Sequence, residues 1–308
     1  MTSFRYQDKD TVIHKLNPFC KLMWISCILV FVLIFDSPLY ILSLFLSTLP
    51  LIIVAKVYKE WASVMKLTVY LCIAIIIINV LVSHHGTHVL LEAPLRIPVI
   101  GTPTITLEAI FFGVAMSLRL LTVISAFTIL TFTIHPDDLM LSMIKMKLPY
   151  KSVLVTSLST RFIPTLIDDV ECISDVQRSR GLELDKGNLV QKIKGRMSII
   201  IPLLSNSLDR TVQISEAMES RAFGSGEKRT FYKELRMSQM DAIILIVEFL
   251  TCVFGISICL SGYGDYQYYP TLEGININGL EWSMLSLLML LLLLALPLAF
   301  VKRSVDLD

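Results

Sequence analysis

The chain has 308 residues, of which 54% are hydrophobic and only 17% charged, and its mean hydropathy is +0.68. A soluble domain of this length could bury so much apolar surface only with an unusually apolar exterior, so the composition excludes an ordinary soluble protein. The net charge of +1 by itself says little about partners. The six cysteines show no spacing typical of a zinc or redox site, so neither a metal nor a disulfide framework is expected.

Six apolar runs are candidates for membrane-spanning helices, because a span takes about 20 predominantly apolar residues. In chain order they are residues 22–35, 39–55, 67–82, 107–134, 242–260 and 285–301. The first is short for a full crossing. The chain is therefore predicted to be an all-α polytopic membrane protein with about six transmembrane helices, four of them within residues 1–134 and two within 241–308.

The basic residues predict the orientation, because Lys and Arg are enriched in cytoplasmic loops. With the N-terminus inside, the inner segments are 1–21, 56–66, 135–240 and the tail after residue 301, and together they hold 25 of the 27 Lys and Arg residues. Both termini are therefore expected in the cytoplasm. The first 20 residues are polar and charged, so no cleavable signal peptide is expected.

A charged residue lies inside the fourth apolar run. An intramembrane charge such as Arg119 usually faces protein or water. Its contact is either another helix of this chain or a partner protein, and both remain open. Glu248, in the fifth run, is a conceivable partner, whereas Glu108 is about three helical turns away and too far for direct pairing.

Three histidines cluster in the outer loop that precedes the fourth run. They are His84, His85 and His88, and clustered imidazoles can bind transition metals. Histidines without a nearby cysteine more often form a polar loop, so no metal site is expected here.

The polar segment 135–240 contains two stretches that echo each other at an offset of 41 residues. The first copy contains Asp168, Ile173, Ser174, Asp175, Ser179, Arg180 and Gly181, and the second contains Asp209, Ile214, Ser215, Glu216, Ser220, Arg221 and Ala222. Walking back from each arginine in steps of three and four gives one helix face, apolar in the first copy and mixed in the second. Pro164 and Pro202 are placed near the helix starts, where proline disturbs a helix least. The segment is thus predicted to hold two long amphipathic helices, each with an arginine near its C-terminus.

A plainer interpretation of the two arginines is a structural one. Arginine near a helix C-terminus interacts favourably with the helix dipole, and basic residues at a cytoplasmic membrane face contact lipid headgroups. Neither role needs the surrounding residues to be duplicated. Two matched copies favour a paired docking device, and its expected residues are Ser179, Arg180, Gly181, Ser220, Arg221 and Ala222.

These residues resemble a known family, the transmembrane T component of energy-coupling factor transporters (the EcfT/CbiQ family). The matching stretches are His-Lys-Leu-Asn-Pro-Phe-Cys-Lys-Leu at 14–22, Gln-Arg-Ser-Arg-Gly-Leu at 177–182, Ala-Met-Glu-Ser-Arg-Ala-Phe-Gly at 217–224 and Lys-Arg-Thr-Phe-Tyr at 228–232. The second and third look like the family's two coupling motifs, which are commonly Ala-Arg-Gly. Here both begin with Ser and the second ends with Ala, which are exchanges of one small residue for another.

The resemblance implies a scaffold that transmits work in a prokaryotic plasma membrane. Arg180 and Arg221 would seat in two ABC-type ATPase subunits, and the membrane part would hold a separate substrate-binding S component. ATP and Mg²⁺ would be used by the ATPases, with no cofactor bound by this chain and no nucleic-acid partner. The cargo would be a vitamin or a metal ion such as cobalt or nickel, taken up through a dedicated or a shared S component.

The sequence carries no ATP site of its own, because no stretch fits the phosphate-cradling Gly-x-x-x-x-Gly-Lys-Ser/Thr motif. A non-catalytic transport subunit is therefore expected. The alternative is a stand-alone permease or an intramembrane enzyme, which would need a cluster of acids or histidines inside the spans. Arg119 and Glu248 are the charges found deep in the apolar runs.

Overall fold

The computed structural model describes residues 9, 11–83, 86–92, 104–146, 149–181, 189–226, 237–274 and 279–305. Two residues of the histidine cluster, His84 and His85, and the matching stretch 228–232 lie outside the described residues. The chain divides into two compact units, Met1–Leu139 with Leu235–Asp308, and Met140–Glu234. We call them the membrane unit and the hairpin unit.

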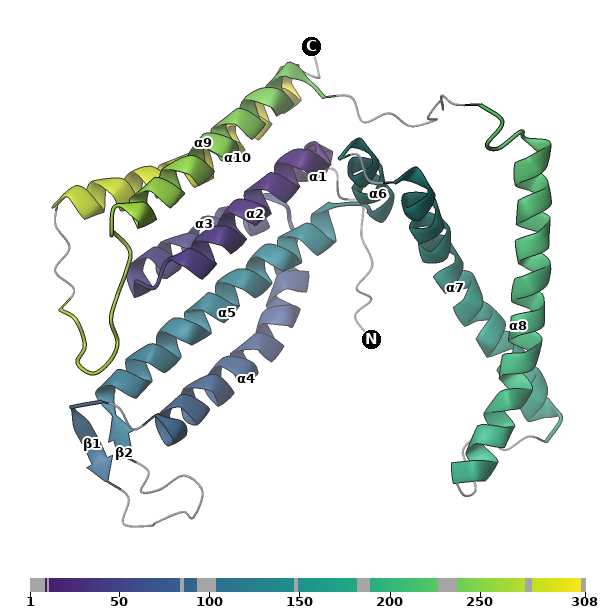
Figure 1. Ribbon diagram of the computed structural model, residues 1–308, viewed down its shortest axis with the longest axis horizontal. Coiled ribbons are helices and arrows are strands. Elements are labelled where there is room, and N and C mark those ends of the chain that lie inside the picture. Colours follow the sequence, from purple (N-terminus) through teal and green to yellow (C-terminus); the bar gives the residue numbers. More distant parts are fainter. Residues whose placement is uncertain are drawn as a thin grey trace. The chain divides into compact units, whose positions relative to one another are not determined.

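All six apolar runs are helices of the membrane unit (Figure 1). They are α2 (Pro18–Ile34), α3 (Pro38–Val54), α4 (Tyr58–Val82), α5 (Leu107–Thr133), α9 (Gln239–Leu260) and α10 (Gly279–Val305). By length and composition α4, α5, α9 and α10 can each cross a membrane, whereas α2 and α3 are shorter apolar helices of 17 residues each. The prediction of an all-α polytopic membrane protein with about six such helices is confirmed.

The remaining elements are short or belong to the hairpin unit. A single turn, α1 (Val12–Lys15), precedes α2, and the antiparallel strands β1 (Val89–Glu92) and β2 (Thr104–Thr106) pair between α4 and α5. A short helix, α6 (Pro136–Lys145), follows α5 and leads to α7 (Tyr150–Ser179) and α8 (Leu189–Ser220).

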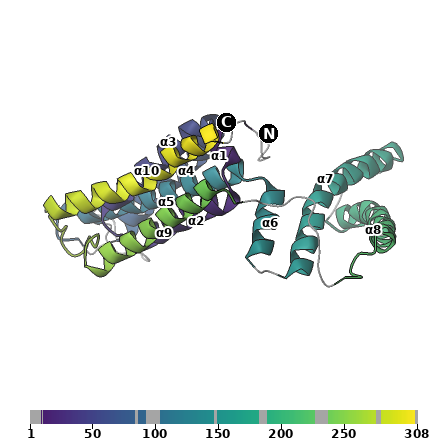
Figure 2. The same cartoon turned by 90° about the horizontal axis from the view of Figure 1, so that it is seen from above.

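Helix α2 lies at the centre of the membrane unit. It packs against α3, α5 and α9, while α10 packs against α9 and α3, and α4 lies along α5 (Figures 1 and 2). The large buried side chains of α2 include Trp24, Ile28 and Phe31. A Cβ atom on Gly255 of α9 would overlap the ring of Phe31, so glycine is what allows these two helices to pack so closely.

Two basic side chains of residues 14–22 contact the last carbonyls of α5. The ring Nε2 of His14 lies 3.2 Å from the carbonyl oxygen of Phe132, and Lys21 Nζ donates to the carbonyl of Thr133 at 2.7 Å. The last carbonyls of a helix have no partner within the helix, and basic side chains satisfy them well. Two side chains of the N-terminal stretch therefore complete a helix more than 100 residues further along the chain.

Candidate functional site

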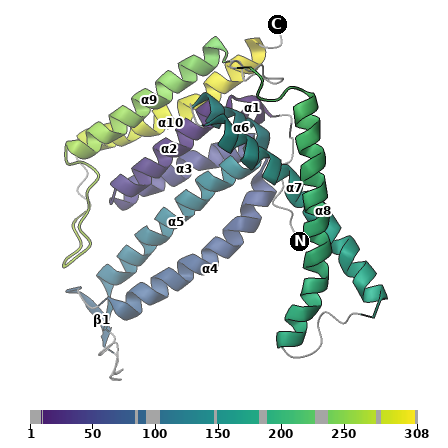
Figure 3. The ribbon, with the colours of Figure 1, turned by 45° about the vertical axis from the view of Figure 1, so that its right-hand side comes forward.

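The two long helices of the hairpin unit are antiparallel and cross each other (Figure 3). Residues near the start of one helix contact residues near the end of the other. The ring of Tyr150 lies 6.4 Å from that of Phe223, and Gln177 Nε2 donates to the carbonyl of Ser198 at 3.4 Å. The start of α7 is thus near the end of α8, and the end of α7 is near the start of α8.

Between these contacts lies an ion pair at the crossing. Arg210 Nη2 donates to Asp169 Oδ2 at 2.9 Å, and both side chains are about three-quarters buried. The two residues are 41 positions apart, which is the offset of the repeat. A residue that contacts its own equivalent lies on the local two-fold axis that relates the copies. The ion pair therefore marks an approximate two-fold axis through the hairpin.

This geometry puts the two arginine tips at opposite ends of the hairpin unit. Arg180 is 11 residues beyond Asp169 (180 − 169), and Arg221 is 11 residues beyond Arg210 (221 − 210). At a rise of 1.5 Å per residue, each tip is roughly 16 Å from the crossing. Both arginines are exposed, and neither guanidinium has a hydrogen bond or ion pair with another described residue. Nothing in the described chain occupies their five donors.

Each arginine is followed by a residue with a left-handed backbone. Gly181 has φ +85° and its N–H donates to Arg178 O at 2.9 Å, and Ala222 has φ +54° and donates to Glu219 O at 2.8 Å. A left-handed residue just after the last turn is a common way to end a helix. A small residue thus follows the last turn of each helix, and a Cβ on Gly181 would meet no atom within 4 Å.

Both helices carry exposed apolar side chains along their length. On α7 they are Val155, Ile163, Ile167, Val170 and Val176, and on α8 they are Met197, Ile200, Ile201, Leu204, Leu208 and Val212. Their exposed fractions lie between 36% and 65%. Contiguous apolar surface of this kind marks a site of contact with protein or membrane.

The expected position of the prolines was wrong. Pro164 is the 15th residue of α7 and Pro202 the 14th of α8, because both helices begin well before them. A proline inside a helix leaves the carbonyl four residues earlier without its partner. For Pro202 that carbonyl belongs to Ser198, and it accepts the hydrogen bond from Gln177 of the other helix. Gln177 thus supplies a hydrogen bond in place of the one that Pro202 removes from the helix.

Arg119 contacts the turn between α2 and α3. Its Nη2 donates to Asp36 Oδ1 at 2.8 Å and to the carbonyl of Phe35 at 2.9 Å. Of the two contacts considered from the sequence, the structure thus contains one within the chain, and the partner is Asp36 rather than Glu248. Sequence reasoning missed Asp36 because it lies outside the apolar runs, in the turn between α2 and α3.

The loop after α9 folds over this turn. Tyr268 donates its hydroxyl hydrogen to Asp36 O at 2.7 Å, and Gly264 O accepts from the main-chain N–H of Asp36 at 3.1 Å. Burial, and then the nearby Asp36 carboxylate, raise the pKa of Tyr268 to about 12, so the phenol stays protonated as a donor. Arg119 therefore belongs to a polar cluster that includes Asp36 and the loop after α9.

Glu248 lies elsewhere, on the buried face of α9. Its side chain is only 5% exposed, and its Oε2 has no hydrogen-bond partner among the described residues. The membrane unit thus holds a buried carboxyl group, and one oxygen of this group has no hydrogen bond to the described residues.

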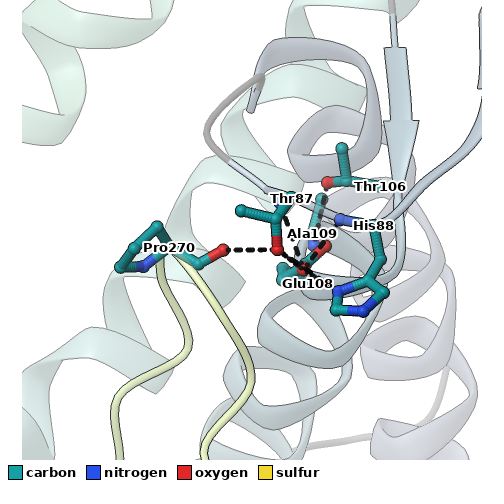
Figure 4. Close-up of polar contacts among 6 residues, drawn as sticks. All are labelled: Thr87, His88, Thr106, Glu108, Ala109 and Pro270. Atoms are coloured by element: carbon teal, nitrogen blue, oxygen red, sulfur yellow. Dashed lines mark hydrogen bonds and ion pairs between the residues drawn. The ribbon is translucent and has the colours of Figure 1, made fainter.

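A second buried carboxylate, Glu108, binds the segment that follows α4 (Figure 4). Glu108 Oε1 accepts from the main-chain N–H groups of Thr87 and His88, from the Thr87 hydroxyl and from His88 Nδ1, at 2.9 to 3.2 Å. Thr87 N–H also lies 3.3 Å from the carbonyl of Pro270, in the loop after α9. His88, the described member of the histidine cluster, is therefore a hydrogen-bond partner of Glu108.

A scan against family models matches residues 9–232 to the cobalt transport protein family CbiQ. Among curated proteins, the chain is similar to energy-coupling factor transporter transmembrane proteins EcfT. The one from Bacillus selenitireducens is 30% identical over 80% of this chain and 92% of its own length. Those from Staphylococcus aureus and Lactococcus lactis are 31% and 30% identical, over 78% and 79% of this chain and 90% and 91% of their own lengths.

Proposed function

The chain belongs to the family of transmembrane T components of energy-coupling factor transporters, and we propose that it couples ATP hydrolysis by two partner ATPases to uptake of a vitamin or metal ion. It is a membrane protein and the transmembrane component of such a transporter. In the proposed arrangement, an S component binds the cargo and the two ATPases bind ATP and Mg²⁺. This chain catalyses no reaction itself.

The observation that carries the proposal is a pair of exposed arginine tips whose guanidinium groups bind no other described residue. Arg180 and Arg221 lie at equivalent distances from the Asp169–Arg210 ion pair, at opposite ends of the hairpin unit. Two equivalent sites related by a local two-fold axis suit a partner that is itself a pair of similar subunits. A guanidinium offers a rigid fork of donors to a carboxylate or to main-chain carbonyls, and it keeps its charge when it is partly desolvated.

The exposed apolar faces of α7 and α8 support a second contact. Apolar side chains that are half exposed on a cytoplasmic helix need a cover of protein or lipid. We propose that the S component covers part of these faces, so that movement of the hairpin unit by the ATPases is passed on to it.

The proposed orientation follows from the distribution of basic residues. Residues 1–134 and 241–308 hold the membrane helices, residues 135–240 form the coupling region in the cytoplasm, and both termini are cytoplasmic. The membrane is the plasma membrane of a prokaryote. Arg119, one of the two intramembrane charges that a stand-alone permease could use, forms an ion pair with Asp36, which favours the scaffold over that alternative.

The test is charge reversal at both tips. We expect Arg180→Glu combined with Arg221→Glu to weaken ATPase attachment more than tenfold, because loss of a desolvated charge partner at an interface costs about 2–5 kcal/mol. The measurement is the amount of the organism's ABC-type ATPase pair that co-purifies with the tagged chain after co-expression, together with the ATPase activity of the eluate.

A matched control is Arg161→Glu combined with Arg196→Glu, which reverses two other exposed arginines of the same helices. The control should retain the ATPases at the unaltered level. Equal recovery of the ATPases with the tip variant and with the unaltered chain would refute the proposed role of the arginines.

A further inference from the structure

The two copies of the repeat in the hairpin unit have opposite charges at two matched positions. When residues 163–181 are compared with the residues 41 positions later, every other matched pair has the same charge or contains at least one uncharged residue. The first exception is Asp169 with Arg210, the ion pair at the crossing. The second is Arg178 with Glu219, each two residues before a tip arginine. These two lie at opposite ends of the hairpin unit, so they do not compensate each other.

The structure of the hairpin unit does not account for the second exception. Arg178 lies in the last turn of α7, 61% exposed, and its Nη1 is 3.9 Å from Oδ1 of the exposed Asp175, a pair of the kind that contributes little. Glu219 is exposed in the last turn of α8 and has no ion pair with another described residue. A cation is favourable at a helix C-terminus, and an anion is unfavourable there. Helix stability therefore explains an arginine at this position but not a glutamate.

The consequence of this exchange is that the two tips differ in charge. Over the last seven matched positions the net charge is +1 at residues 175–181 and −1 at residues 216–222. The charged residues are Asp175, Arg178 and Arg180 in the first copy, and Glu216, Glu219 and Arg221 in the second. Two identical subunits would offer the same charges to both tips, so one of the tips would meet an unfavourable surface.

We propose that the two tips bind two different ATPase subunits, and that Arg178 and Glu219 determine which tip binds which subunit. The subunit that binds the Arg180 tip presents an acidic group to Arg178, and the subunit that binds the Arg221 tip presents a basic group to Glu219. Charged groups at an interface add specificity because a like charge opposes the wrong partner. The inference rests on the proposed function and goes beyond it, since a pair of identical ATPases would also satisfy that function.

The test is photo-crosslinking from each tip in the complex of the full chain with the organism's ABC-type ATPases, each carrying a different epitope tag. Cysteines are introduced by Ser174→Cys or Ser215→Cys in a Cys172→Ser background, and they are modified with a maleimide-linked benzophenone. The two serines are matched positions, one helical turn before Arg178 and Glu219 on the same helix face. We expect each position to crosslink to one subunit at least about tenfold more than to the other, and the preferred subunit to differ between the two positions.

Charge exchange tests the residues themselves. Arg178→Glu combined with Glu219→Arg should lower each tip's preference at least about tenfold or reverse it, because both tips then face a like charge in their original subunits. The matched control is Asp175→Glu combined with Glu216→Asp, which exchanges the neighbouring acids without a change of charge. The control should retain the preference of the unaltered chain.

The outcomes separate this inference from the proposed function. Crosslinking of both positions to both subunits without preference, or a preference that survives the charge exchange, would overturn the inference and leave the proposed function intact. Crosslinking of neither position to an ATPase that co-purifies with the chain would refute the seating of the tips, and with it both proposals.

Discussion

The residue after each tip arginine shows how one backbone angle shapes the site. Gly181 and Ala222 occupy matched positions, and both have positive φ. Glycine adopts this conformation freely, whereas an alanine pays for its Cβ with about 1–2 kcal/mol. The second tip is therefore held in a strained turn, and the first is not.

We expect Ala222→Gly to stabilise the end of α8 by about 1 kcal/mol, because it removes this strain. The measurement is hydrogen–deuterium exchange of the last turn of α8 in the full chain, which should become slower. The matched change Gly181→Ala should act in the opposite direction at the end of α7. Faster exchange in Ala222→Gly would show that the alanine is not strained.

Two carboxylates, Asp36 and Glu108, connect segments that are far apart in the sequence. Asp36 and Glu108 each hold a segment that comes from a distant part of the chain, Asp36 through Arg119 and Tyr268, and Glu108 through Thr87. Neither acid belongs to a motif, since a single carboxylate at the edge of an apolar run has no signature. Its partner is selected by the packing of helices that are far apart in sequence.

At the scale of elements, the hairpin depends on contacts between two imperfect helices. Pro202 frees the carbonyl of Ser198, and Gln177 of α7 donates to it. Pro202 removes a hydrogen bond from α8, and it thereby leaves an acceptor for a side chain of α7.

This arrangement predicts non-additive effects on stability. Gln177→Leu should cost about 1 kcal/mol, the usual net value of one hydrogen bond, because it leaves the Ser198 carbonyl without its donor. In a Pro202→Ala background the helix supplies its own donor to that carbonyl, and the cost of Gln177→Leu should largely vanish. Thermal unfolding of the four chains in detergent gives the coupling. Equal losses in both backgrounds would contradict the assignment.

The repeat acquires its meaning at the same scale. The offset of 41 residues predicts two similar helices, and it also relates Asp169 to Arg210, a pair of opposite charge. The sequence contained this signal, but a repeat alone does not say whether its copies lie parallel or antiparallel. The contacts of Tyr150 with Phe223 and of Gln177 with Ser198 show that the arrangement is antiparallel, which puts the two tips at opposite ends of the hairpin unit.

At the scale of the whole molecule, the proposed orientation can be tested with a natural cysteine. Cys172 on α7 is exposed, whereas the other cysteines, all within membrane-unit helices, are buried or half-buried. A membrane-impermeant maleimide should label Cys172 in inverted vesicles and not in intact spheroplasts, because the hairpin unit is expected in the cytoplasm. Labelling is followed by the mass shift of the purified chain.

Two variants make the labelling experiment conclusive. Cys172→Ser should abolish labelling in inverted vesicles. Ser261→Cys in that background places a thiol at an exposed position of the loop after α9 and should be labelled in spheroplasts. Labelling of Cys172 from the outside would reverse the proposed topology.

The sequence by itself determined the class of protein, its helical spans and the two arginine tips. Hydropathy over about 20 residues, the offset of the repeat and the small residues after each arginine are local properties, so they can be read without knowledge of packing. Tertiary structure alone decided that Arg119 pairs with Asp36, that His14 and Lys21 contact the last carbonyls of α5, and that the two tips lie at opposite ends of the hairpin unit. Each of these depends on which helices meet, and the free energy that selects their packing is summed over contacts between residues far apart in the chain.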